Sequence, residues 1–313
     1  MILNPDSAPL TREIADYPEG IIIPIDKPYR WTSADVIRKV KYAAIRHFGK
    51  KNLKVGHAGT LDPLATGVLL VCIGKATKLA EELQSHDKEY VAGVTFGATT
   101  PSYDLEKEID RFFPHEHIRA EAVEKALPAF IGEQDQIAPL FSAKSVDGVR
   151  AYELARKLYK ASAEQSSELD TAAEQLLRVS RINITELELL SFADRNEGLL
   201  DRATRGTEAG GPQAERSGGV SEANVHEPSS CQHATTASSR INVTDNSALG
   251  LPRAVIRMAC SKGTYVRAFA RDLGEALGSG AHLDSLQRSR SGQFRVENAL
   301  TVEQALQKLQ SAI

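Results

Sequence analysis

Residues 56–67, GHAGTLDPLATG, place one carboxylate, Asp62, among small residues, a proline and three glycines. The residue before a proline is driven toward extended backbone angles, so Pro63 should keep Asp62 out of a helix. Gly59 and Gly67 can take a positive φ or allow another backbone to approach closely. The stretch therefore predicts a rigid bend that presents one acid, which is either an ordinary Asx turn or a reactive carboxylate.

The chain around this bend alternates between strand-like and helix-like patterns. Strands are expected at 20–28, 68–74, 88–97, 181–192, 254–261 and 292–296, where apolar and β-branched residues cluster. Helices are expected at 33–44, 77–85, 119–131, 151–160, 263–278 and 301–312, where apolar residues recur at helical spacing. Because the order has no regular βαβ repeat, an α+β fold is favoured over a doubly wound sheet.

Composition limits the function classes. The chain has 313 residues, 42% of them hydrophobic, and a formal net charge of −3. This length supports one large domain or two small ones, and the near-neutral charge means that any nucleic-acid surface must be a local one. The three cysteines lie far apart with no CxxC spacing, which argues against a disulfide framework or a metal site. With neither a signal peptide nor a run of about 20 apolar residues, a cytoplasmic protein without a membrane span is expected.

Two segments differ from the rest. Residues 1–19 form a polar leader, and residues 193–250 are rich in Gly, Ser, Ala, Thr and Glu but poor in large apolar side chains. Such a composition buries too little apolar surface to offset the entropy of ordering. We therefore predict a flexible, low-complexity insertion at 193–250 within one catalytic domain made of residues 20–192 and 251–313.

A reactive carboxylate needs a cation beside it to remain ionised. Arg267 stands in the first turn of the helix expected at 263–278, where the helix dipole disfavours positive charge. It is either a solvated arginine or the partner of Asp62. Tyr90, at the start of an expected strand, is either a half-buried sheet residue or a ring that stacks on a base. His57 could stack, donate to phosphate or fill the loop.

A basic stripe precedes the bend. Between residues 38 and 54 the chain has no acid, one histidine (His47) and seven lysines and arginines: Arg38, Lys39, Lys41, Arg46, Lys50, Lys51 and Lys54. Clustered cations on a near-neutral protein indicate an RNA contact surface or, equally, a solvated helix face. A second cluster, Arg288, Arg290 and Arg295, precedes the last expected helix.

Several blocks of the sequence resemble a known protein family. Residues 56–79, GHAGTLDPLATGVLLVCIGKATKL, resemble the signature of the TruB family, the bacterial tRNA pseudouridine-55 synthases. Further blocks that resemble the family follow its order: IDKPYRWTSADVIRKVK at 25–41, DKEYVAGVTFG at 87–97, PLFSAKSVDGVRAYELAR at 139–156 and CSKGTYVRAFARDLGEALGSGAHLDSLQRSRSG at 260–292. The resemblance implies a pseudouridine synthase fold, a mixed and mostly antiparallel sheet flanked by helices around an RNA-binding cleft. The C-terminal RNA-binding domain of many members is not evident.

The resemblance also implies roles. Asp62 falls on the catalytic aspartate, Tyr90 on the active-site tyrosine and Arg267 on the arginine that pairs with the aspartate. Substrate contacts are implied for His57, Leu286, Lys27 and Pro28, and the RNA surface would add Arg38, Lys39, Lys41, Lys50 and Lys51. The implied reaction converts a uridine of the tRNA T-arm loop to pseudouridine without metal or cofactor, in a monomer. The alternative is a tRNA chaperone that folds the T-arm without catalysis.

Overall fold

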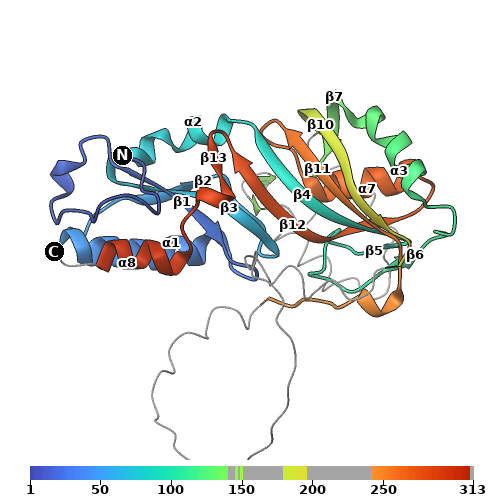
Figure 1. The fold of residues 1–313 in the computed structure, drawn as a ribbon, viewed down its shortest axis with the longest axis horizontal. Coiled ribbons are helices and arrows are strands. Elements are labelled where there is room, and N and C mark those ends of the chain that lie inside the picture. The colour runs from blue at the N-terminus through green and yellow to red at the C-terminus, as the bar shows by residue number, and fades with distance from the viewer. Residues whose placement is uncertain (140–144, 147–148, 151–178, 196–240, 311–313) are drawn as a thin grey trace, which may run out of the picture.

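A computed structural model describes residues 1–139, 145–146, 149–150, 179–195 and 241–310 (Figure 1). Its main feature is one curved sheet whose strands follow the order β1-β3-β12-β4-β11-β10-β7, with β2 added to β3 and β13 to β12. The bounds are β1 Ile21–Lys27, β2 Val55–Ala58, β3 Ala65–Ile73, β4 Lys88–Phe96, β7 Gly132–Ile137, β10 Val179–Ala193, β11 Arg253–Cys260, β12 Ala281–Ser291 and β13 Phe294–Arg295. All these pairings are antiparallel except β3 with β12. The expected α+β class is confirmed.

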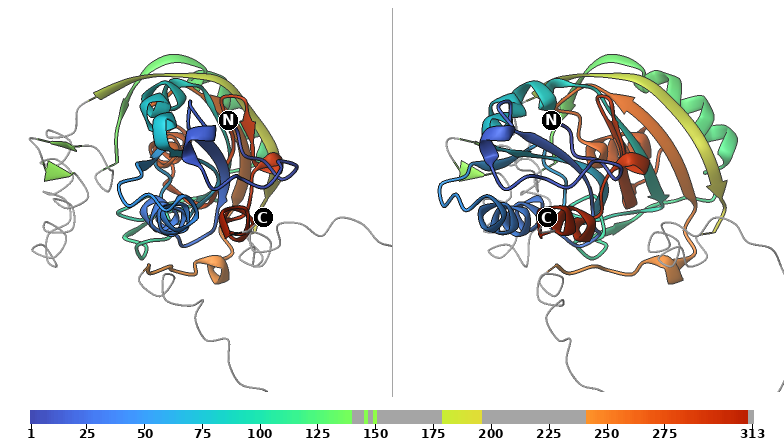
Figure 2. Two further views of the ribbon diagram at one scale, coloured as in Figure 1. Left: turned by 90° about the vertical axis from the view of Figure 1, so that its left-hand side faces the viewer. Right: turned by 60° about the vertical axis from the view of Figure 1, so that its left-hand side comes forward.

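Helices flank this sheet. α1 (Ser33–Phe48) and α8 (Val302–Gln310) lie side by side at one end, as Figure 2 shows, and α3 (Ala120–Ala126) and α7 (Val266–Ala276) lie toward the other. α1 begins with a capping box in which Thr32 and Asp35 bond each other's backbone, and it ends at the left-handed Gly49. Both features are strong helix signals. The prediction of this helix from its cap and apolar spacing is therefore confirmed.

Some expected elements are shorter than predicted. The helix expected at 119–131 is α3 followed by the 3-10 turn η3 (Leu127–Phe130), because Pro128 interrupts the helical hydrogen bonds. The helix expected at 77–85 divides into the turn η2 (Gly74–Leu79) and α2 (Ala80–Ser85). The helix expected at 151–160 lies outside the described residues, as does most of the segment 193–250. No described helix is long and apolar enough to cross a membrane.

The central strand β12 escaped prediction. Its sequence, AHLDSLQRSRS, lacks the apolar alternation of a strand, because it buries polar side chains instead: His282, Arg288 and Ser291 are at most 2% exposed. The leader is also part of the core. Leu3 and Leu10 are at most 1% exposed, and the Leu3 N–H donates to the carbonyl of Ile22 in β1.

The parallel contact between β3 and β12 joins two halves of the sheet. The register pairs Leu286 with Ala65 and Arg288 with Gly67. Gly67 has φ +97°, and a Cβ placed there would lie 2.2 Å from the carbonyl oxygen of Arg288. Only glycine allows the two backbones to approach this closely. We call this contact, residues 65–67 against 286–288, the seam.

We expect Gly67→Ala to destabilise the protein by more than about 3 kcal/mol, because it adds a clash with rigid backbone to the strain of a positive φ. Gly49→Ala is the matched control, since Gly49 has φ +60° with nothing within 4 Å of the added atom, and it should cost only about 1 kcal/mol. Chemical denaturation of both variants measures the difference. Equal losses would show that the seam tolerates a side chain.

Candidate active site

Asp62 lies in the loop between β2 and β3, beside the seam. The Leu61 N–H donates to the Ser33 hydroxyl at 3.0 Å, and that hydroxyl donates to the Leu61 carbonyl at 3.2 Å. On the other side of Asp62, the Lys27 ammonium donates to the Pro63 carbonyl at 3.2 Å. Gly59, with φ +83°, begins the bend. The loop is thus held on both sides of the acid, as the expected rigid bend requires.

Arg267, on the first turn of α7, holds the Asp62 carboxylate. Its Nε lies 2.9 Å from Asp62 Oδ2, and its Nη1 donates to the Ser102 carbonyl at 3.1 Å. The Arg267 side chain is 5% exposed, whereas that of Asp62 is 39% exposed. Burial alone would lower the pKa of Arg267, but the charges of Asp62 and Asp104 outweigh it and raise that pKa. A permanently charged arginine therefore fixes one carboxylate oxygen, and the acid still faces solvent. The expected ion pair is present.

A second carboxylate, Asp104, reaches the same guanidinium. Its Oδ2 lies 3.7 Å from Arg267 Nε, and its Oδ1 accepts hydrogen bonds from the Ser102 hydroxyl and the Glu106 N–H. Asp104 is buried, and these contacts occupy both of its carboxylate oxygens. Its role is therefore to hold the Arg267 guanidinium in place. No sequence signal singles out Asp104, because it lies 42 residues from Asp62 in a turn without helical or strand periodicity.

A small pocket, partly open to solvent, lies beside Asp62. Two of its sides come from the two strands of the seam, so the pocket exists because β3 and β12 meet there. Its walls combine carboxylates and one arginine with four leucines, a lining that suits a flat ring with polar edges. The lining residues are Asp62, Leu64, Ala65, Asp104, Leu105, Arg267, Leu283, Asp284, Ser285 and Leu286. Leu286 therefore lines this pocket, and its contact with substrate stays a prediction.

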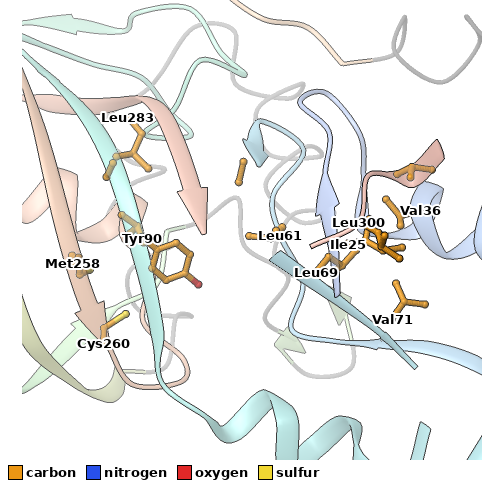
Figure 3. Close-up of a cluster of buried hydrophobic side chains, with 14 of the residues drawn as sticks. Ile25, Val36, Leu61, Leu69, Val71, Tyr90, Met258, Cys260, Leu283 and Leu300 are labelled. Atoms are coloured by element: carbon orange, nitrogen blue, oxygen red, sulfur yellow. The ribbon is translucent and has the colours of Figure 1, made fainter. Parts of the chain in front are cut away.

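Tyr90 approaches the loop from β4. Its ring is 9% exposed, belongs to the main hydrophobic core and points toward the loop that carries Leu61 (Figure 3). Burial raises the pKa of its hydroxyl, and the nearby Arg288 guanidinium, which hydrogen-bonds the hydroxyl, opposes that shift. Tyr90 is thus a neutral phenol close to the Asp62 loop, although it does not line the pocket itself.

Arg288 connects Tyr90 to the same loop. Its Nε donates to the Val68 carbonyl at 2.7 Å and its Nη2 to the Gly59 carbonyl at 3.1 Å. At 2% exposed, Arg288 does not share a surface with Arg290 and Arg295, so the three arginines do not form one basic patch. Sequence analysis gave its residue type but not its burial, which depends on the unpredicted strand β12.

The lysine of the N-terminal motif is also buried. Lys27 is 0% exposed, and its ammonium donates to three carbonyls, those of Pro28, Trp31 and Pro63, at 3.0, 2.6 and 3.2 Å. Its expected contact with substrate is therefore corrected: Lys27 joins the β1–α1 loop to the Asp62 loop. Pro28 contributes a carbonyl to this junction.

His57, on β2, is partly buried. Burial, and then the charge of Arg288, lower the pKa of its imidazole, so the ring is neutral near pH 7. Its Nδ1 has no hydrogen-bond partner among the described residues. The ring therefore retains an unused polar atom, and its substrate contact stays a prediction.

The basic stripe is exposed to solvent except for its histidine. All seven lysines and arginines between residues 38 and 54 are exposed, and Lys41, Lys51 and Lys54 line an open groove of about 830 Å³. Arg38 pairs with Asp35 at 3.0 Å, and the Lys39 ammonium lies over the Trp31 ring. His47 is only 3% exposed and bonds the Thr11 carbonyl, so it does not belong to the stripe.

Comparisons with known proteins agree with this geometry. Residues 46–201 match the TruB family pseudouridylate synthase N-terminal domain, and residues 267–312 match the tRNA pseudouridylate synthase B C-terminal domain. The tRNA pseudouridine synthase B of Phocaeicola vulgatus is 44% identical over 288 residues, 92% of each chain. The chain belongs to the TruB family. The C-terminal match covers α7, β12 and α8, which are parts of the same sheet and its flanking helices.

The chain also has more distant similarities. The tRNA pseudouridine synthase B of Thermus thermophilus is 37% identical over 279 residues, which cover 89% of this chain and 75% of that one. A solved Cbf5–Nop10–Gar1 complex shares the fold with a TM-score of 0.52 at 22% identity, and the match covers 96% of this chain and 58% of that one. Among the described residues of this TruB-family chain, no cluster of His, Cys, Asp and Glu could hold a metal ion.

We expect Arg267→Lys to lower the single-turnover rate on a tRNA transcript by about 100-fold. A lysine keeps the charge but donates from a single nitrogen, whereas the planar guanidinium bonds Asp62 through Nε and the Ser102 carbonyl through Nη1, so the carboxylate loses its fixed orientation. Arg271→Lys is the matched control one helical turn further on, where the arginine bonds Asp272 and the Ile137 carbonyl instead. Similar losses in both variants would contradict a special role for Arg267.

Lys27 should also make stability depend on pH. Burial lowers its pKa to about 7, whereas an unfolded lysine titrates at 10.5. Between these values the unfolded chain binds a proton that the folded protein does not, so the free energy of unfolding should rise with pH, by at most about 1.4 kcal/mol per unit. Denaturation from pH 7 to 10 checks the slope against Lys27→Met, which should lack this contribution. Parallel curves would contradict it.

Proposed function

We propose that this protein isomerises a uridine to pseudouridine in the T-arm loop of tRNA, at position 55. The observation that carries the proposal is the Arg267–Asp62 ion pair at the mouth of a pocket lined by leucines and polar groups. The relatives named tRNA pseudouridine synthase B, 37–44% identical over most of the chain, support uridine as the target and tRNA as the substrate.

The residue types suit this chemistry. Isomerisation breaks the N1–C1′ bond of the uridine, turns the base and joins C5 to C1′, while the C5 proton is lost and N1 gains one. Asp62, which is partly exposed and fixed by Arg267, assists by attack on C1′ or C6. Because no electron is transferred overall, the reaction requires no redox cofactor. Leu286 and the other leucines of the pocket would hold the flat base.

The uridine must leave its stacked position to reach Asp62. Extruding a base costs a few kcal/mol, which contacts with the rest of the RNA must offset. The exposed basic stripe and its groove can supply phosphate contacts through Lys39, Lys41, Lys50 and Lys51, with Arg38 beside them. Recognition would depend on the shape of the T-arm more than on its sequence. We infer a monomer that acts in the cytoplasm.

The test is tritium release from a tRNA transcript labelled with 5-³H-uridine. The proposal predicts release of one tritium per transcript, and no release when cytidine replaces the uridine at position 55. Product mapping should place the single pseudouridine at that position. Release that persists with the cytidine transcript would move the target elsewhere in the tRNA.

The same experiment separates the alternative. A chaperone would bind the transcript and promote T-arm folding without releasing tritium, because that function needs the cleft and the basic stripe but not the carboxylate. Transcript binding by wild-type protein without any release would therefore favour the chaperone over the synthase.

A further inference from the structure

The segment that precedes β11 contacts a residue of the pocket wall and the loop between β1 and α1. The Thr244 N–H donates to the carbonyl of Leu105, which lines the pocket, at 2.8 Å. Three residues earlier, the Ile241 carbonyl accepts a bond from Arg30 Nη2, also at 2.8 Å. In Figure 1 this segment is the orange chain that runs below the sheet toward β5 (Ala98–Thr99) and β6 (Arg111–Phe112). Its two hydrogen bonds join the β1–α1 loop to Leu105 in the wall of the pocket.

Arg30 holds an unusual backbone conformation. Its φ is +63°, and among the described residues only one other non-glycine, Tyr103, has a positive φ. Such a conformation costs about 1–3 kcal/mol and persists where the surrounding structure enforces it, most often at functional sites. Arg30 is enforced from both sides, because Lys27 bonds the carbonyls of Pro28 and Trp31. The same ammonium bonds Pro63, next to Asp62, so the Arg30 loop is fixed to the catalytic loop.

The Arg30 guanidinium has unused donors. An arginine carries five N–H donors, yet within the described chain this one makes a single hydrogen bond, to Ile241, and no ion pair. Its Nε is buried without a partner, as is the hydroxyl of the adjacent Tyr29. Burial raises the pKa of Tyr29; Arg30 opposes this shift, and Asp104 and Asp284, both pocket residues, add to it. Within the part of the chain that the structure describes, these two neighbouring donors therefore lack acceptors, and Tyr29 lies near enough to two pocket carboxylates for their charges to act on it.

We propose that Arg30 binds a backbone phosphate of the RNA next to the extruded uridine, with the Tyr29 hydroxyl as a second donor. This inference rests on the proposed function. Extruding a nucleotide brings its flanking phosphates to the mouth of the pocket, and a phosphate offers the paired oxygens that a guanidinium bonds best. The Ile241 carbonyl is the partner of Arg30 in the free protein, and the phosphate replaces it.

The test compares Arg30→Gly and Arg30→Lys with wild-type protein. Glycine takes a φ of +63° without strain, so Arg30→Gly should fold at least as stably as wild type. Its KM for the transcript should rise about tenfold with kcat within twofold, and the slope of log K against log salt should become shallower by about 0.7–0.9, one phosphate contact. Arg30→Lys should keep most of the slope.

Arg181→Gln is the control for charge. Arg181 is exposed on β10, pairs with Glu133 and Asp135 across to β7, and its loss removes the same charge; its salt slope should equal that of wild type. An unchanged salt slope and KM in Arg30→Gly would overturn the inference. Faster amide exchange at 241–250 in that variant would then show that Arg30 only stabilises this segment through its bond to Ile241. If wild-type protein forms no pseudouridine, the proposed function fails. The salt dependence of transcript binding tests the phosphate contact of Arg30 separately, because it requires no catalysis.

Discussion

The active site depends on the close approach of two parallel strands at the seam. With no side chain on Gly67, the backbone of β3 lies against that of Arg288 in β12, and Ala65 comes to pair with Leu286. This contact joins the half of the sheet that carries Asp62 to the half that carries Tyr90. The pocket forms where the two halves meet, so its geometry follows from the packing of backbone rather than from any single catalytic side chain.

Three buried basic side chains then fix the Asp62 loop from different directions. Arg288 bonds the carbonyl of Gly59, Lys27 that of Pro63, and Arg267 bonds Asp62 itself. Burying a cation costs free energy unless its donors are satisfied, and here most of the acceptors are backbone carbonyls of the site. These three side chains therefore fix the position of the Asp62 loop more than they stabilise the fold, as expected where a reactive group must be preorganised.

The sequence predicted the local features well. The cap at Thr32, the buried apolar runs of β1 and β3 and the proline after Asp62 are short-range signals. The position of Arg267 against a helix dipole made it only a candidate, and its pairing with Asp62 was implied by the family resemblance. β12 escaped prediction because its burial of polar side chains depends on partners far along the chain. For the same reason Asp104 was missed, the burial of Arg288 was not foreseen, and Lys27 was expected to contact substrate although its side chain is buried. The sequence gives the identity of each residue, but whether its side chain is buried depends on contacts with residues far along the chain.

The most direct measurement of the central claim is the single-turnover rate of pseudouridine formation by Asp62→Asn at saturating tRNA transcript. Asparagine keeps the shape of the side chain, and Asp104 still faces Arg267, so the variant should fold and bind the transcript. The account predicts a rate at least about 10⁴-fold below that of wild type. A rate within tenfold of wild type, with the product at the same position, would show that another group performs the chemistry.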